Sequence, residues 1–155
     1  MINFINGNIL NATEDIICHQ VNCKGVMGSG LAKQIKDKYP ECYQAYKEFL
    51  QIYKPNKALG KSQIVPCNDG KFVVNIYGQL NYGIDKQHTD YKALWNGLDS
   101  VANAVTNINK YKNKTVAIPY GIGCGLGGGD WVIVYAIIQE IFDSYGCDVT
   151  IYKLN

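Results

Sequence analysis

A glycine-rich segment between an apolar run and a helical pattern is the feature that most constrains the fold of this chain. The segment IPYGIGCGLGGGDW, residues 118–131, holds six of the sixteen glycines. Glycine loses more conformational entropy on folding than any other residue, so such a run needs a compensating role. We predict that it brings main-chain N–H groups close to a phosphate at the N-terminus of a helix.

A second glycine loop, KGVMGSG at 24–30, follows the apolar strand DIICHQV at 15–21 and precedes a predicted helix over 29–39 with Ser29 as its N-cap. Further helices are predicted over 40–53, 89–107 and 130–145, and further strands for INFI, SQIVPC, KFVVNIYG, TVAIP and DVTIYKL. This alternation predicts an α/β fold, in which three layers (α/β/α) surround a mixed central sheet in a single domain over 1–155. Both glycine loops then lie beyond the carboxyl ends of strands, where ligands bind in such sheets.

Several classes of protein are disfavoured by the composition. No stretch approaches the ~20 apolar residues of a membrane span, and the start MINFINGNIL lacks the pattern of a secretory signal, so we expect a cytoplasmic protein with no membrane partner. The six cysteines form no C-x-x-C pair, and several lie in apolar runs. We therefore expect buried free thiols, and neither a metal nor a cofactor.

The choice of basic residues limits how this chain can bind a phosphate. All fifteen are lysines, and they are scattered along a chain of net charge +2, which disfavours binding of nucleic acid through charge. Without arginine, no bidentate guanidinium clamp is available. A bound phosphate must then be held by backbone amides, lysines or hydroxyls.

Two known nucleotide-binding motifs can be compared with the glycine loops. Gly123-x-Gly125-x-x-Gly128 matches the dinucleotide fingerprint, with Asp148 about twenty residues further on. That fingerprint opens its fold, whereas this one lies near the end of the chain, and Asp148 begins its predicted strand instead of ending it. Neither loop contains Gly-Lys-Ser/Thr, which excludes a P-loop NTPase. A tight connection that binds no ligand remains an open alternative.

The candidate catalytic residues each have a structural alternative. His19 ends an apolar strand and is either a catalytic residue or a hydrogen-bonded core histidine; polar residues follow it, namely Gln20, Asn22 and Lys24. Asp130 is an N-cap for the last helix, a catalytic acid, or both. His88 lies in a polar connection, where we expect it to be exposed without a partner. A nucleophilic role for Cys124 is disfavoured, because no histidine can be paired with it.

Three motifs in order, NGNIL, CHQVNCKGVMGSGLA and IPYGIGCGLGGGDW, resemble the macro domain, a module that binds ADP-ribose. The resemblance spans almost the whole chain. The segment VNCKGVMGSGLAKQIKDKYP, and LGK followed by a VP strand, are most similar to the branch that holds ADP-ribose-1''-phosphate phosphatases and the terminal ADP-ribose protein glycohydrolase.

This resemblance implies a set of ligand contacts. Asn8, where many macro domains have aspartate, and Ile9 would border the adenine, with Tyr152 nearby. The first glycine loop would pass over the distal ribose and the pyrophosphate, and the second would cradle the pyrophosphate with its N–H groups. The full implied set is Asn8, Ile9, Gln20, Asn22, Met27, Gly28, Ser29, Gly30, Leu31, Pro119, Gly121, Ile122, Gly123, Cys124, Gly125, Leu126, Gly127 and Tyr152.

The resemblance also bears on catalysis. The glycohydrolase uses a lysine after the fourth strand and an aspartate after the GL of the second loop, but Gln79 and Gly127 stand at these positions. Glutamine cannot form a Schiff base with ribose, so the phosphatase branch fits better. It implies His19 as general acid, base or nucleophile, Asn22 orienting the ribose, and Asp130 ordering a water.

Three functions stay open at this point. We favour a hydrolase that acts on an ADP-ribose derivative, in the manner of the phosphatases, with de-ADP-ribosylation or deacylation as a variant. The second is a non-catalytic module that binds free nucleotide or ADP-ribosylated protein. The third, a nucleic-acid-binding protein of the same fold, is disfavoured by the lysine pattern. We expect a monomer.

Overall fold

The apolar runs of the sequence form the six strands of one sheet in the computed structural model, which describes residues 1–155. The strands are β1 (Ile2–Asn6), β2 (Ile16–Asn22), β3 (Ser62–Pro66), β4 (Phe72–Gln79), β5 (Val116–Pro119) and β6 (Val149–Lys153). Their spatial order is β1-β6-β5-β2-β4-β3, and every neighbouring pair is parallel except the β3–β4 hairpin. The predicted mixed sheet is confirmed.

The longer helices begin and end within two residues of their predicted limits: α1 (Gly30–Lys38), α2 (Pro40–Ile52), α4 (Tyr91–Asn107) and α5 (Trp131–Tyr145). Their ends carry ordinary helix signals, with Pro40 in the first turn of α2 and side-chain caps at Asp90 and Asp130. The sequence analysis missed the short helix α3 (Pro55–Ala58) and the 3₁₀ turn η1 (Ile9–Asn11).

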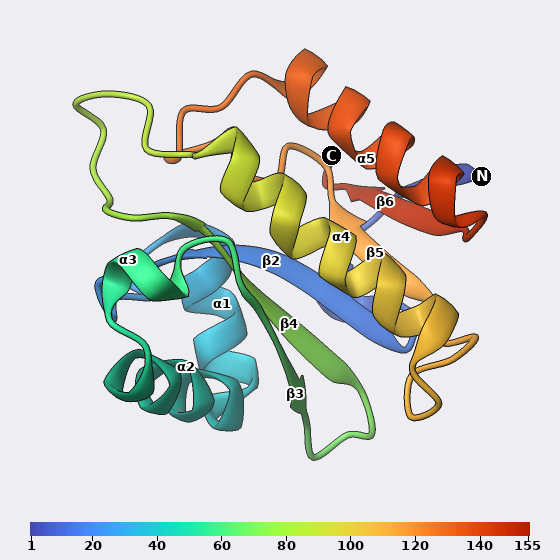
Figure 1. The fold of residues 1–155 in the computed structure, drawn as a ribbon, viewed down its shortest axis with the longest axis horizontal. Coiled ribbons are helices and arrows are strands. Elements are labelled where there is room, and N and C mark those ends of the chain that lie inside the picture. The colour runs from blue at the N-terminus through green and yellow to red at the C-terminus, as the bar shows by residue number, and fades with distance from the viewer.

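The helices cover both faces of the sheet, which confirms the three-layer arrangement (Figure 1). Helices α4 and α5 pack on one face in a core of nineteen buried residues, which includes the fully buried Leu94, Leu98 and Phe142. Helices α1 and α2 cover the other face with Ile35, Cys42 and Tyr46. Strand β5 contributes Val116 and Ile118 to the first core and Ala117 to the other side, as expected for a central strand.

The two central strands separate toward their carboxyl ends. β2 and β5 pair only through Ile16 and Ile17, whereas β5 continues along β6 as far as Pro119. The chain leaves β2 toward α1 on one face and leaves β5 toward α5 on the other face (Figure 1). Such a divergence opens a crevice at the carboxyl edge of the sheet, where ligands bind in α/β folds.

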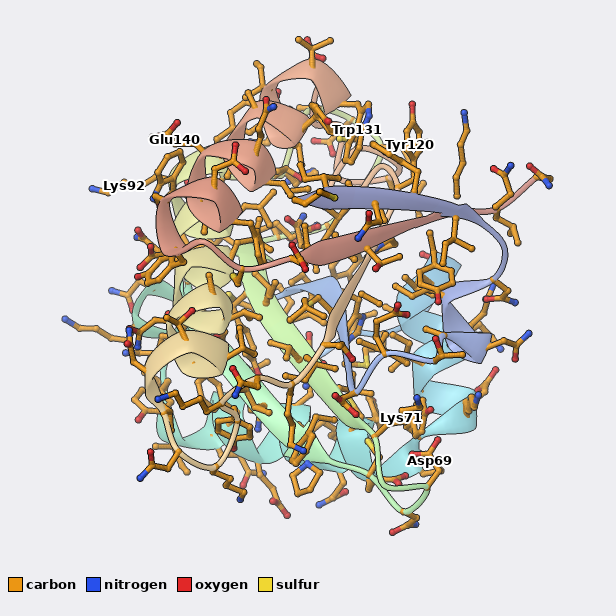
Figure 2. The ribbon with its side chains drawn as sticks, turned by 90° about the vertical axis from the view of Figure 1, so that its right-hand side faces the viewer. Asp69, Lys71, Lys92, Tyr120, Trp131 and Glu140 are labelled. Carbon is orange, nitrogen blue, oxygen red and sulfur yellow. The ribbon has the colours of Figure 1, made fainter.

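The opposite end of the sheet is closed by the β3–β4 hairpin. Figure 2 shows Asp69 and Lys71 of this hairpin far from Tyr120 and Trp131, whose rings lie 4.5 Å apart between centroids beside the second glycine loop.

Two predictions about composition can also be checked here. All six cysteines are free, and Cys18, Cys23 and Cys42 are buried while the others are half-buried, so the expectation of free thiols is confirmed. None of the helices combines the length and the apolar character that crossing a membrane requires.

Candidate functional site

A cleft of about 730 Å³ lies where β2 and β5 separate. Its walls come from the end of β2, the first glycine loop, the start of α1, the end of β4, the segment 82–84 and the second glycine loop. The predicted site residues that line it are His19, Gln20, Asn22, Gly28, Ser29, Gly30, Leu31, Pro119, Gly121, Ile122, Gly123, Gly125, Leu126 and Gly127.

The other predicted residues lie outside this lining. The Asn8 side chain caps η1 by accepting the N–H of Leu10 at 3.0 Å. Tyr152 is buried with Ile9, and its hydroxyl donates to a carboxylate oxygen of Glu14 at 2.6 Å. Met27 is buried in the core under α2. The thiol of Cys124 donates to the carbonyl oxygen of Ile122 instead of facing the cleft, and burial raises its pKa to about 11.

The second glycine loop leaves a row of N–H groups without a partner in the protein. The amides of Ile122, Cys124, Gly128 and Gly129 donate to carbonyl oxygens within the loop region. The amides of Gly121, Gly123, Gly125, Leu126 and Gly127 make no such bond, and all five residues line the cleft. Unpaired backbone donors need a partner from water or a ligand, so this row favours an anion.

A second set of donors faces the same cleft from the start of α1. Ser29 occupies the predicted N-cap position with an extended backbone, but its side chain makes no capping bond. The amides of Gly30, Leu31 and Ala32 therefore have no acceptor in the protein. Together with the positive end of the helix dipole, these amides are a second group of donors suited to an anion.

No lysine, aspartate or glutamate lines the cleft. The field at the site comes from main-chain dipoles and from neutral side chains, namely His19, Gln20, Asn22, Ser29, Gln79, Tyr82 and Tyr120. This agrees with the restriction set by the missing arginines. An anion here would be held by directed N–H groups.

His19 is deeply buried at the floor of the cleft, with 1% of its surface exposed. Its Nε2 lies 2.6 Å from Oδ1 of Asn75, which is its register partner on β4. Since that oxygen accepts, Nε2 carries the proton and Nδ1 is left as a lone-pair acceptor with no partner. Burial lowers the pKa of His19 to about 4, so the imidazole is neutral at pH 7.

The carboxamide of Asn22 makes most of its hydrogen bonds within and beneath the first glycine loop. Its oxygen accepts from the Tyr46 hydroxyl at 2.7 Å and from the Lys24 amide at 3.0 Å, and its nitrogen donates to the carbonyl of Val26 at 2.8 Å. One amide proton remains for a ligand. Asn22 therefore shapes the loop, and its contact with a ribose stays a prediction.

The structure confirms one expectation and corrects another. Asp130 is exposed, lies outside the cleft lining and caps α5 by accepting the N–H of Val132 at 2.9 Å, as the N-cap alternative predicts, and its role in catalysis stays a prediction. The side chain of His88 is 6% exposed, and its Nε2 lies 2.9 Å from a carboxylate oxygen of Asp85, where we expected an exposed group without a partner. Both groups of this pair lie beside Gly83, where an added Cβ would meet them.

Comparison with known proteins decides the family. Residues 18–138 match the family model of the macro domain. The chain belongs to the macro domain family. Its relatives include the DNA ADP-ribosyl glycohydrolase of Mycobacterium tuberculosis, 31% identical over 98% of this chain and 42% of the relative, and the ADP-ribose 1''-phosphate phosphatase of Saccharomyces cerevisiae, 24% identical over 99% and 98%. The chain thus spans about two fifths of the glycohydrolases that it matches.

Solved structures agree. The macrodomain of Mycobacterium tuberculosis DarG has a TM-score of 0.81 at 27% identity, with 98% of this chain and 97% of that one covered. A Bacteroides thetaiotaomicron protein of unknown function has a TM-score of 0.83 at 26% identity, with 99% and 98% covered.

Sequence reasoning missed one wall of the cleft in this macro domain. Tyr82, Gly83 and Ile84, which follow β4, line the cleft, as does Gln79 at the end of that strand. Tyr82 and Ile84 are 51% and 87% exposed, so they form an apolar rim. The predicted strand KFVVNIYG, followed by a loop, was a usable signal. Because β4 pairs with β2 in parallel, the segment after β4 emerges at the same edge of the sheet as the glycine loop after β2.

Proposed function

We propose that this macro domain binds ADP-ribose or a derivative of it in the cleft between β2 and β5, and that it hydrolyses the derivative at the distal ribose in the manner of an ADP-ribose-1''-phosphate phosphatase. The observation that carries the proposal is the row of unpaired N–H groups in the second glycine loop, which faces those of α1 across the cleft. The names of the relatives, phosphatase and glycohydrolase, point to the same class of ligand.

Binding is supported by the match between donors and ligand. A diphosphate carries its charge on several oxygens, and backbone N–H groups fixed in a loop can approach them without losing side-chain entropy. Hydrogen bonds to a charged group contribute about 1.5–3 kcal/mol each. Several such bonds offset part of the entropy that the ligand loses on binding.

Hydrolysis is supported by His19, the one histidine in the lining. We propose that a water in the cleft attacks the phosphorus of the 1''-phosphate while Nδ1 of His19 accepts its proton. Because Nδ1 is buried in the free protein, this step requires the groups that cover it to move when the derivative binds. The new P–O bond forms as the bond from phosphorus to the ribose oxygen breaks, and the proton then passes to that oxygen. A phosphate dianion beside the imidazole raises the pKa of His19, which makes this base stronger in the complex than in the free protein.

A non-catalytic binding module is the second candidate, and the absence of any charged side chain from the lining favours it. Glycohydrolysis through a lysine is disfavoured, because Gln79 ends β4 and its side chain is hydrogen-bonded to Gln20 and Asn81.

Two measurements test the proposal. Calorimetric titration with ADP-ribose is expected to show saturable binding at one site. Incubation with ADP-ribose-1''-phosphate is expected to release phosphate, and His19→Ala and His19→Gln are each expected to reduce that rate at least about 100-fold. Binding without turnover would assign the chain to the non-catalytic class, and absence of binding would refute the proposal.

A further inference from the structure

Thr89 lies against the second glycine loop on the side away from the cleft. It is 4% exposed, and it forms an isolated bridge with Gln79 at the end of β4. Its hydroxyl donates to the carbonyl oxygen of Gly123 at 2.6 Å and accepts from Nε2 of Gln20 at 2.9 Å. Thr89 does not line the cleft, and no function was predicted for it from the sequence.

The direction of these hydrogen bonds is fixed by a relay that begins at a main-chain carbonyl. Because the carbonyl of Asn81 can only accept, Nε2 of Gln79 donates to it at 2.7 Å. The oxygen of Gln79 then accepts from Nε2 of Gln20 at 2.8 Å, and the second proton of that nitrogen goes to the Thr89 hydroxyl. The Thr89 hydroxyl accepts this proton, so its own single proton is donated to the carbonyl oxygen of Gly123.

The relay and the backbone together saturate two carbonyls of the glycine loop. The oxygen of Gly123 also accepts the N–H of Gly129 at 2.9 Å. The oxygen of Gly127 accepts the N–H groups of His88 at 2.8 Å and of Thr89 at 3.0 Å. Thr89 supplies two of these four donors, so both carbonyls are bonded to a residue that lies outside the cleft lining.

Peptide planes between glycines rotate easily, since no Cβ restricts φ. A rotation at Gly123 or Gly127 would point a carbonyl oxygen into the cleft, where it would repel an anion and disturb the neighbouring N–H donors. We propose that Thr89 is a positioning residue for anion binding: its hydroxyl and its N–H hold these peptides with their carbonyls turned away. This inference rests on the binding part of the proposed function, but it does not depend on catalysis.

The two glycines fit this arrangement. A Cβ on Gly123 would lie 3.2 Å from both Oγ1 and Cγ2 of Thr89, and a Cβ on Gly127 would collide with the same hydroxyl. Thr89 is thus one of the groups that restrict these positions to glycine, together with Oε1 of Gln20 and the φ of +74° at Gly123 and with the carbonyl oxygen of Gly123 at Gly127.

The test is Thr89→Val, which removes the hydroxyl at nearly constant volume. Calorimetry is expected to show an ADP-ribose Kd raised at least about 10-fold, and Thr89→Ser is expected to keep the Kd within about threefold of the original protein. The matched control is Thr106→Val. It removes a similar hydroxyl bond, 2.7 Å to the carbonyl of Ala102 in α4, at a site remote from the cleft. We expect this control to leave the Kd unchanged.

Equal Kd values for Thr89→Val and the original protein would overturn the inference and leave the proposed function standing. Loss of affinity in Thr89→Ser as large as in Thr89→Val would overturn it as well, because the hydroxyl would then not be the cause. If the original protein itself binds no ADP-ribose, the proposed function is refuted, and the inference about Thr89 is refuted with it. Should Thr89→Val not fold, Thr89→Ala removes the same hydroxyl without added bulk, and the same comparison with Thr89→Ser applies.

Discussion

The substitution Gly125→Ala tests whether the second glycine loop binds a ligand or only connects β5 to α5. Gly125 lines the cleft, its amide has no partner in the protein, and a Cβ built on it meets nothing within 4 Å. Its φ lies outside the left-handed region that only glycine favours. Alanine is therefore compatible with the folded backbone, and it reduces the conformational freedom of the unfolded chain. The free energy of unfolding should stay constant or rise by up to about 1 kcal/mol.

The same methyl group projects into the space that we assign to the ligand. If it blocks one hydrogen bond from an amide to a phosphate oxygen, the loss is about 1.5–3 kcal/mol. At 1.4 kcal/mol for each factor of ten, the Kd for ADP-ribose should rise about 10- to 150-fold. Calorimetry measures the affinity, and urea denaturation of the free protein measures the stability.

Gly70→Ala is the matched control, because it should give the reverse pattern. Gly70 lies in the β3–β4 hairpin at the far end of the sheet, with φ +87° and open space around its Cβ position. Alanine in this conformation costs roughly 1–2 kcal/mol of stability, and the affinity should not change. The reasoning is refuted if Gly125→Ala binds ADP-ribose as tightly as the original protein, or if both variants lose affinity in proportion to their stability.

Two further predictions concern stability. Gly127→Ala should lower the free energy of unfolding by about 1–3 kcal/mol in urea, because its Cβ would lie 2.8 Å from the Gly123 oxygen and would collide with Thr89; an unchanged urea midpoint would contradict the close packing. The pKa of His19 is lowered from its ordinary 6.5 to about 4, so only the unfolded chain takes up this proton between these values. Stability should fall as the pH drops through that window, by up to about 3 kcal/mol at pH 4 from this residue. His19→Gln should lose correspondingly less, and equal pH profiles of the two proteins would count against a buried neutral imidazole.

Much of the fold could be predicted from local patterns. The longer helices follow apolar residues at helical spacing, and proline or aspartate marks their starts, so their limits agree to within two residues. The short elements α3 and η1 bury few residues of their own, Ala58 and Ile9, and had no periodic signal.

The site was predictable in part for a similar reason. Glycine loops after parallel strands locate the cleft, but the sequence does not say which amides lack partners. Which amides lack partners depends on the conformation of the loop, and tertiary hydrogen bonds hold that conformation, such as those from the amides of His88 and Thr89 to the carbonyl oxygen of Gly127. The relay through Gln20, Gln79 and Thr89 joins three segments distant in sequence, and no pattern within any one of them indicates it.

The most direct test of the account is a crystal structure with ADP-ribose bound. We predict phosphate oxygens at hydrogen-bonding distance, about 2.7–3.2 Å, from the unpaired amides of Gly123, Gly125, Leu126 or Gly127 on one side and from the first amides of α1 on the other. A diphosphate placed outside this cleft, or held by lysine side chains instead of main-chain N–H groups, would contradict it.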